Sequence, residues 1–165
     1  MELKIKLNNL KYRYDVYQMF NIYYALDEIK FEEDGNYIIN IEEDKISFSF
    51  NDFYRECNVL ENIKEDIKRL IFSSLKEITG DYYPWGILVG IRPSKIALKY
   101  LEEGKSEKEI IDLFAKKHLA SEEKAKLCIK VAKKEQELVN KDEKSIAIYI
   151  GMAFCPTRCF YCSFT

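Results

Sequence analysis

Three cysteines near the C-terminal end restrict how this chain can fold and what it can bind. Cys155, Cys159 and Cys162 form a C-x3-C-x2-C array within eight residues. The apolar run 146–150 precedes them and is typical of a β-strand. A strand that delivers three thiols into one short loop can hold an iron–sulfur cluster at three corners. The fourth iron is then free to bind another molecule, so we expect any chemistry to be concentrated in the last tenth of the chain.

Free thiolates usually bind zinc or iron, and the spacing separates these metals only in part. A structural zinc site needs four ligands, and this loop supplies three. A fourth would have to come from Cys57, His118 or Cys128, each far away in the sequence. The spacing therefore favours a [4Fe–4S] cluster over zinc, and three unrelated free cysteines remain as an alternative. We expect Cys57 and Cys128 to pack as small apolar side chains, and Cys128 to share a helix face with Ala125, Val131 and Ala132. We expect His118 to lie at the surface or in a helix cap.

Composition limits the class of protein. The chain has 165 residues, enough for one well-buried core or one core with appendages. Its net charge of −2 gives no general case for binding nucleic acid or an anionic membrane. Five cysteines, three of them clustered, indicate metal ligands in a reducing compartment rather than disulfides. The sequence shows neither an apolar run of about 20 residues nor a signal peptide, which predicts a cytoplasmic protein.

Residues 1–82 predict an amino-terminal α+β domain. The expected elements are a strand at 2–7, a helix from Asp15 to about residue 29, strands at 36–41 and 45–51, and a helix at 59–79. Asp15 and Gln18 would form a capping box for the first helix, Asn58 would cap the second, and Gly80 would end it. This order predicts a small antiparallel sheet with helices packed on one face.

Residues 83–141 predict a helical subdomain. Pro93 is placed as the first residue of a helix that ends near Leu101 and is closed by Gly104. Ser106 begins a capping box with Glu109 for a helix at about 107–117. A last helix is expected at about 122–139, starting from Ser121.

Two stretches resemble a known family. Residues 148–164, IYIGMAFCPTRCFYCSF, resemble the radical S-adenosylmethionine (SAM) signature, and more narrowly its oxygen-independent coproporphyrinogen III oxidase (dehydrogenase)-like branch. Residues 85–95, WGILVGIRPSK, resemble an amino-terminal extension of one subfamily of that branch. The resemblance implies that residues 142–165 begin a radical SAM (β/α) barrel that is truncated here. We therefore expect the amino-terminal part of a longer radical SAM oxidoreductase, which is not catalytic alone.

The resemblance also implies roles for single residues. Cys155, Cys159 and Cys162 would ligate three irons of a [4Fe–4S] cluster, and SAM would bind the fourth. Tyr161 would lie near the adenine, and Tyr149 near the cluster and the methionine part of SAM. The implied partners are the rest of the barrel, an electron donor such as flavodoxin or ferredoxin, and a porphyrinogen-like substrate of haem biosynthesis.

Three positions depart from the family pattern. Gly151 stands where the family usually has His, Ala153 where it usually has Pro, and Phe164 where the authentic oxidase has a fourth Cys. Relatives that lack this fourth Cys include haem-trafficking chaperones of the same branch. The substrate therefore has two interpretations, porphyrinogen conversion and haem transfer.

Two other functions are compatible with the sequence before the cysteines. Residues 106–139 have the pattern of a helix, a turn and a second helix. Residues 92–141 contain 13 basic and 9 acidic residues. Binding of nucleic acid, with or without a structural metal, is therefore an alternative function. Glutamates interrupt the basic face, which favours a solvated face with Glu/Lys pairs. Residues 1–140 could instead dock on the barrel or on a partner protein. Arg92 could bind a carboxylate, although a structural ion pair is the favoured interpretation.

Overall fold

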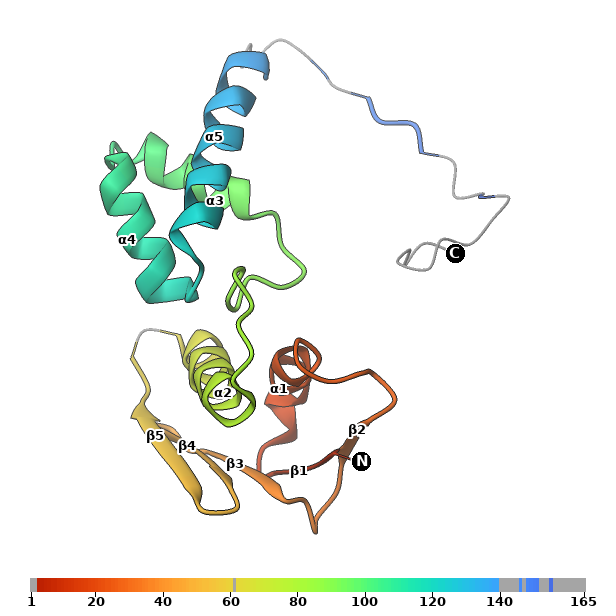
Figure 1. Ribbon diagram of the computed structural model, residues 1–165. Helices are drawn as coiled ribbons and strands as arrows, with labels where there is room; N and C mark the ends of the chain where they lie inside the picture. The colour runs from red at the N-terminus through yellow and green to blue at the C-terminus, as the bar shows by residue number, and fades with distance from the viewer. Residues whose placement is uncertain (1–2, 61, 140–145, 147, 152–154, 156–165) are drawn as a thin grey trace.

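The computed structural model describes residues 3–60, 62–139, 146, 148–151 and 155, and within them the chain is α+β. The strands are β1 (Leu3–Leu7), β2 (Ile29–Phe31), β3 (Tyr37–Ile41), β4 (Lys45–Phe50) and β5 (Phe53–Asn58). The helices are a 3₁₀ turn (Leu10–Tyr12), α1 (Arg13–Phe20), α2 (Ile63–Thr79), α3 (Pro93–Glu102), α4 (Glu107–His118) and α5 (Glu122–Leu138). Figure 1 shows the sheet with α1 and α2 at one end of the molecule and α3, α4 and α5 at the other. None of the described helices has the length and apolar character needed to cross a bilayer.

The sheet is mixed, with the strand order β2-β1-β3-β4-β5. β1 is parallel to both of its neighbours, whereas β3, β4 and β5 form an antiparallel meander. The prediction of an antiparallel sheet is therefore wrong for β1 and β2. Between β2 and β3 the chain crosses β1, and a Cβ on Gly35 would lie only 2.4 Å from the backbone nitrogen of Lys6. Glycine at position 35 permits this close crossing.

The main hydrophobic core lies between the sheet and the two helices that cover one of its faces. Strand residues that alternate in sequence point to the helices, which is the period-2 pattern of a half-buried sheet. The core side chains with no solvent exposure are Ile5, Val16, Met19, Phe20, Ile39, Ile46, Phe48, Ile67, Ile71 and Leu75. This core fixes the position of α2, from which the chain enters the helical unit.

The start and end of the first helix differ from the prediction. Asn9 caps the preceding 3₁₀ turn by accepting a hydrogen bond from the Lys11 amide, and the expected Asp15–Gln18 capping box does not form. Asp15 is instead buried inside α1, and its carboxylate lies 3.3 Å from Nζ of Lys68 in α2. The helix ends at Phe20, and residues 21–28, which were expected to continue it, form turns. Ile29, at the predicted end of the helix, begins β2, which pairs with β1.

The prediction also missed β5 and misplaced the start of α2. Asn58 is the last residue of β5 rather than a helix cap. The cap is Asn62, whose side chain accepts a hydrogen bond of 3.1 Å from the Lys64 amide. The predicted end of the helix is confirmed, since Gly80 adopts the left-handed conformation with φ of 76°.

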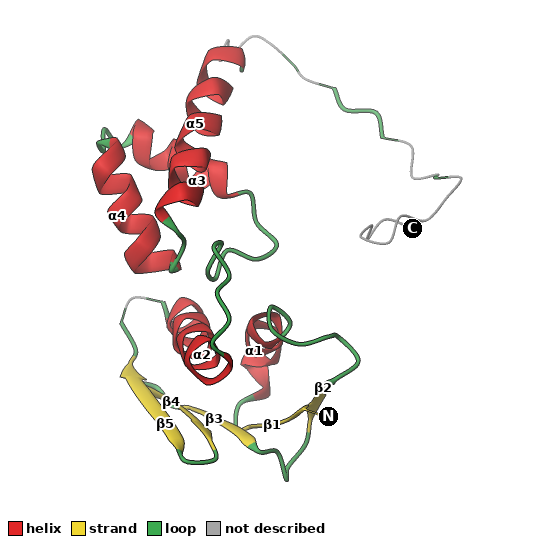
Figure 2. Cartoon of the chain, in the orientation of Figure 1, coloured by secondary structure: helices red, strands yellow, loops and turns green. Residues whose placement is uncertain are grey.

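The helices α3, α4 and α5 enclose a second hydrophobic core (Figure 2). Its buried residues are Leu88, Ala97, Ile110, Phe114, Ala120, Ala125, Cys128, Ile129 and Ala132. The predicted helix starts are confirmed: Pro93 occupies the first turn of α3, Ser106 and Glu109 form a capping box on α4, and Ser121 caps α5. Gly104 follows α3 with φ of 78°, as its predicted closing role requires.

Replacing Ser106 with alanine should lower the free energy of unfolding by about 1 kcal/mol, because the first turn of α4 loses its cap. The Ser106 hydroxyl accepts from the Glu109 amide at 3.3 Å, and the Glu109 carboxylate accepts from the Ser106 amide at 2.8 Å. Urea unfolding measures the change. Ser73→Ala, inside α2, is the control, and an equal loss in both variants would mean that the capping box contributes nothing.

The barrel strand predicted at 146–150 does not form in the described part of the chain. Residues 146 and 148–150 have no regular secondary structure and are almost fully exposed. A parallel barrel strand needs neighbouring strands to pair with its backbone. The described residues contain no such neighbour, and no barrel is seen among them.

Candidate metal centre

The predicted metal ligands lie in the segment that follows the helical unit. Cys155 is exposed and is a free thiol. Tyr149 is 93% exposed, whereas Cys159, Tyr161 and Cys162 lie outside the described residues. No three potential metal ligands come together among the residues that the structure describes. It therefore stays a prediction that the three thiols meet at one cluster. The prediction is based on the ligand atoms, because three soft thiolates suit an iron–sulfur cluster.

The two remaining cysteines are packed in apolar surroundings, as predicted. Cys57 is half-buried in β5 against the main core, and Cys128 is buried in α5 beside Ala125 and Ala132. Val131, expected on the same face, is instead 40% exposed, because α3 and α4 cover only one side of α5. Burial raises the pKa of both thiols. A protonated thiol is a poor metal ligand, so neither residue offers a ready fourth ligand for zinc.

His118 is buried rather than at the surface, so that expectation is wrong. His118 is the last residue of α4 and is only 7% exposed. Its ring packs edge-on against the ring of Phe114, with 5.6 Å between the ring centres. Its Nε2 atom has no hydrogen-bond partner among the described residues. Ile110, Phe114 and His118 recur every fourth residue on one face of α4, a signal that could have revealed the burial.

The burial of His118 predicts a loss of stability in mild acid. Burial lowers the pKa of His118, while Glu65 opposes this shift and Arg69 and Lys117 add to it. The unfolded chain therefore binds a proton near pH 6.5 more readily than the folded chain does. Stability is fully present above this pH and falls as the pH drops, by at most about 1.4 kcal/mol per pH unit for one proton.

His118→Phe removes the titrating group and keeps an aromatic side chain against Phe114. Urea unfolding at several pH values between 7 and 5 should show a smaller loss of stability in this variant than in the parent chain. Parallel pH profiles for the two proteins would contradict the assignment.

The two cores are joined where the segment after α2 meets the end of α4. The Ile87 amide donates to the His118 carbonyl at 2.9 Å, and Nη1 of Arg69 donates to the Lys117 carbonyl at 3.1 Å. Gly86 adopts φ of 57°, and a Cβ at this position would lie 2.1 Å from the His118 carbonyl oxygen. Residues 85–95, which resemble the amino-terminal extension, thus include Gly86 and Ile87, which contact the end of α4.

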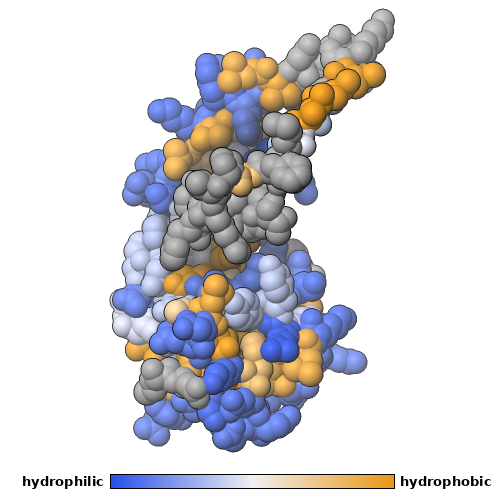
Figure 3. All heavy atoms as spheres, turned by 90° about the vertical axis from the view of Figure 1, so that its right-hand side faces the viewer, coloured by the Kyte–Doolittle hydropathy of each residue, from blue (hydrophilic) through white to orange (hydrophobic). Residues whose placement is uncertain are grey.

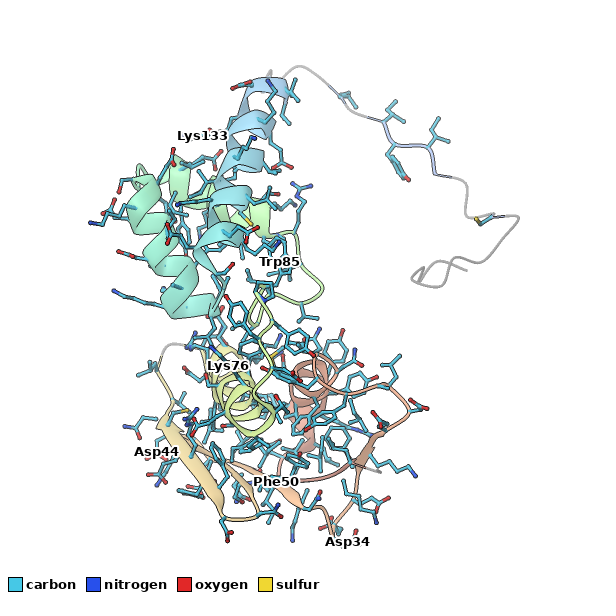
Figure 4. The ribbon with its side chains drawn as sticks, viewed as in Figure 1. Asp34, Asp44, Phe50, Lys76, Trp85 and Lys133 are labelled. Atoms are coloured by element: carbon cyan, nitrogen blue, oxygen red, sulfur yellow. The ribbon has the colours of Figure 1, made fainter. Side chains whose placement is uncertain are left out.

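An open groove of about 540 Å³ borders this junction between α2 and α4. Phe72, Tyr82, Ala115 and Leu119 give it an apolar lining, and Lys76 stands at its side with its ammonium group 5.1 Å from the Tyr82 ring (Figure 4). Glu77 also lines the groove, and its carboxylate pairs with Arg55.

Most of the lysines on α5 have acidic or aromatic neighbours. Lys126 pairs with Glu122, Lys133 with Glu107 of α4, and Lys134 with Glu137, each at 2.6 Å. Lys124 lies over the ring of Trp85. Pairs between residues three or four apart are the ordinary pattern of a solvated helix face.

The ion pair predicted for Arg92 is present. Its Nε lies 3.9 Å from a carboxylate oxygen of Glu135 in α5, on an exposed part of the surface. Such a pair contributes little to stability. The pair joins the residue before α3 to the last turn of α5.

Comparisons with known proteins give one informative similarity. No protein-family profile matches the chain, and no solved structure matches it. The similarity that is found is to an oxygen-independent coproporphyrinogen-III oxidase-like protein. This relative is HemZ of Bacillus subtilis (strain 168), which is 35% identical over 114 residues. The match covers 66% of the present chain and 22% of HemZ, so the chain spans about a fifth of the length of this relative.

Proposed function

We propose that this chain is part of a radical SAM protein of the oxygen-independent coproporphyrinogen III oxidase-like branch. The observation that carries the proposal is the 35% identity to HemZ over two-thirds of the chain. The cysteine array supports it independently, because the C-x3-C-x2-C spacing points to a three-thiolate cluster site from the sequence alone.

The proposed task of the cysteines is to hold a [4Fe–4S] cluster and leave one iron open. Cys155, Cys159 and Cys162 supply the three thiolates, and Tyr149 and Tyr161 line the binding place of SAM. The chemistry supplied by such a cluster, when bound, is one-electron reduction of SAM. The electron would come from a flavodoxin or ferredoxin type of donor.

The proposed substrate is porphyrinogen-like, in keeping with the name of the relative. A haem-transfer function is the second candidate, and Phe164 favours it because the authentic oxidase has a cysteine at this position. The two differ in what the protein does with a tetrapyrrole. In the full-length protein that contains this chain, conversion of propionate to vinyl groups supports the oxidase function, and stable haem binding without conversion supports the chaperone function.

Iron content tests the cluster proposal directly. After anaerobic reconstitution of the full-length protein with iron and sulfide, we expect about four irons per chain. Alanine at any one of Cys155, Cys159 or Cys162 should remove most of this iron. Cys57→Ala and Cys128→Ala are the matched controls and should keep it, since both thiols are packed in the two cores.

Two results would contradict the proposal. One is tight zinc binding with no iron–sulfur cluster, which would indicate a structural metal. The other is an equal loss of iron in the control variants, which would mean that the metal does not depend on the C-terminal array.

A further inference from the structure

The sheet has a free edge along β5. Among the described residues no strand pairs with the outer side of β5, which stands last in the strand order (Figure 1). Directly after β5, the Val59 amide donates to the Asp44 carbonyl at 2.8 Å. Hydrogen-bonded pairs alternate along an antiparallel ladder, so every second residue counted back from Val59 bonds to β4. The backbone N–H and C=O groups of Tyr54, Glu56 and Asn58 therefore point away from the sheet.

The opposite edge of the sheet, β2, is less suited to pairing with another strand. It has three residues, whereas β5 has six. Lys4 of the neighbouring β1 forms an ion pair with Glu32, which directly follows β2, and charged side chains at an edge discourage strand addition. Figure 3 shows this side of the molecule, where many hydrophilic side chains surround the sheet. β5 is thus the edge that is more open to another strand.

A groove of about 270 Å³ lies between β5 and α2. Cys57, Leu60 and Leu70 supply the apolar part of its lining, and Leu60 is 74% exposed. A strand added beside β5 would place every second side chain on the α2 side of the sheet, over this groove. A fitting strand therefore carries an apolar side chain opposite Cys57.

A second copy of β5 meets this requirement. When two copies run antiparallel with Arg55 at the centre, Phe53 of the second copy lies opposite Cys57, and each groove receives one aromatic ring. Tyr54 then lies opposite Glu56 of the second copy. These two side chains already form a hydrogen bond of 2.5 Å within one chain, so they are compatible neighbours. Two such pairs, each exchanging both backbone bonds, add about four hydrogen bonds to the interface.

Charge favours this register over the neighbouring one. A pairing centred on Glu56 would place two carboxylates directly opposite each other, which is unfavourable. A pairing centred on Arg55 brings two guanidinium groups together, but each is already paired with Glu77 of its own α2. The two ion pairs together carry no net charge.

We propose that two copies of this chain form a two-fold symmetric dimer by antiparallel pairing of β5, with Arg55 at the symmetry axis. The contact joins the two five-stranded sheets into one continuous sheet. It goes beyond the proposed function and uses none of the proposed cluster ligands. A contact between two short strands is small, so the dimer is reversible, with a Kd of about 10 to 100 µM.

Sedimentation velocity of the full-length protein that contains this chain, prepared without iron, tests the pairing. We expect a concentration-dependent dimer. Glu56→Pro removes an amide that points to the free edge and leaves the bonds to β4 in place, so it should weaken the dimer about tenfold or more. Glu56→Ala, the matched control, keeps this amide and should change the Kd by less than about threefold. Circular dichroism confirms that both variants fold.

Two substitutions at position 54 test the register without changing the backbone. Tyr54→Glu places a carboxylate opposite Glu56 of the second copy, whereas Tyr54→Lys places an ammonium group there. Tyr54 is 61% exposed, so both variants should keep the fold. The dimer of the lysine variant should be about tenfold tighter than that of the glutamate variant. Equal Kd values would overturn the register.

A protein that remains a single chain at about ten times the expected Kd would overturn the proposal. So would a dimer that Glu56→Pro leaves unchanged, because its interface would lie elsewhere. Iron content after reconstitution is measured separately and does not depend on β5. The dimer and the cluster proposal can therefore fail independently.

Discussion

Gly86→Ala should lower the free energy of unfolding by about 3 kcal/mol, the sum of left-handed backbone strain and overpacking. A methyl group at this position would meet the His118 carbonyl oxygen at 2.1 Å and the Leu119 carbonyl carbon at 2.5 Å. Both are backbone atoms at the end of α4, which cannot move aside like a flexible side chain. The clash should also weaken the Ile87 to His118 hydrogen bond that joins the two units. Urea unfolding gives the free energy, and hydrogen exchange of the Ile87 amide reports on the junction.

Gly104→Ala is the matched control for this change. Gly104 has φ of 78°, and a Cβ there would meet nothing within 4 Å. Only the backbone strain remains, so we expect a loss of about 1 kcal/mol. Equal losses at the two glycines would show that the close contact at position 86 does not constrain the junction.

Asp66→Ala should cost about 3 kcal/mol, because it removes one partner of a buried ion pair. Asp66 is 3% exposed, and its carboxylate accepts from Nη2 of Arg69 at 2.5 Å and from the Leu60 amide at 2.9 Å. Without Asp66, the Leu60 amide and part of the Arg69 guanidinium lose their partner. Arg69 also contacts the Lys117 carbonyl, so the change acts on the junction as well.

Glu65→Ala is the control on the same helix. Glu65 approaches the same guanidinium at 3.4 Å, but its side chain is 41% exposed. Exposed pairs contribute little, so we expect a loss below about 1 kcal/mol. Thermal or urea unfolding distinguishes the two variants, and similar losses would mean that burial of Asp66 adds nothing to the pair.

The helical unit could be predicted almost residue by residue. Pro93, Ser106, Ser121 and Gly104 are local signals, since each acts through its own backbone or through a residue three positions away. Such signals can be read from a single sequence without knowing the rest of the fold.

The sheet could be predicted only in part. The hairpin of β3 and β4 has a strong local pattern, but β2 and β5 are short or half-buried strands that form by pairing with a neighbour. The crossing over β1 at Gly35 depends on a contact between segments that the sequence does not show to be close. Pairing over such distances is set by tertiary packing, and local propensity does not report it.

The candidate site, too, could be predicted only where the signal is local in the sequence. The cysteine array could be found from spacing, because a cluster imposes its ligand pattern on one short loop. The burial of His118 is indicated by its four-residue spacing from Phe114 and Ile110. The tight junction at Gly86 could not be found from spacing, since it arises where two units meet.

Low-temperature EPR of the reduced, reconstituted full-length protein that contains this chain, with and without SAM, tests the proposed radical SAM function. We predict a [4Fe–4S] signal that shifts when SAM is added and disappears when Cys155, Cys159 and Cys162 are replaced by alanine. A cluster whose signal does not respond to SAM would contradict the proposal.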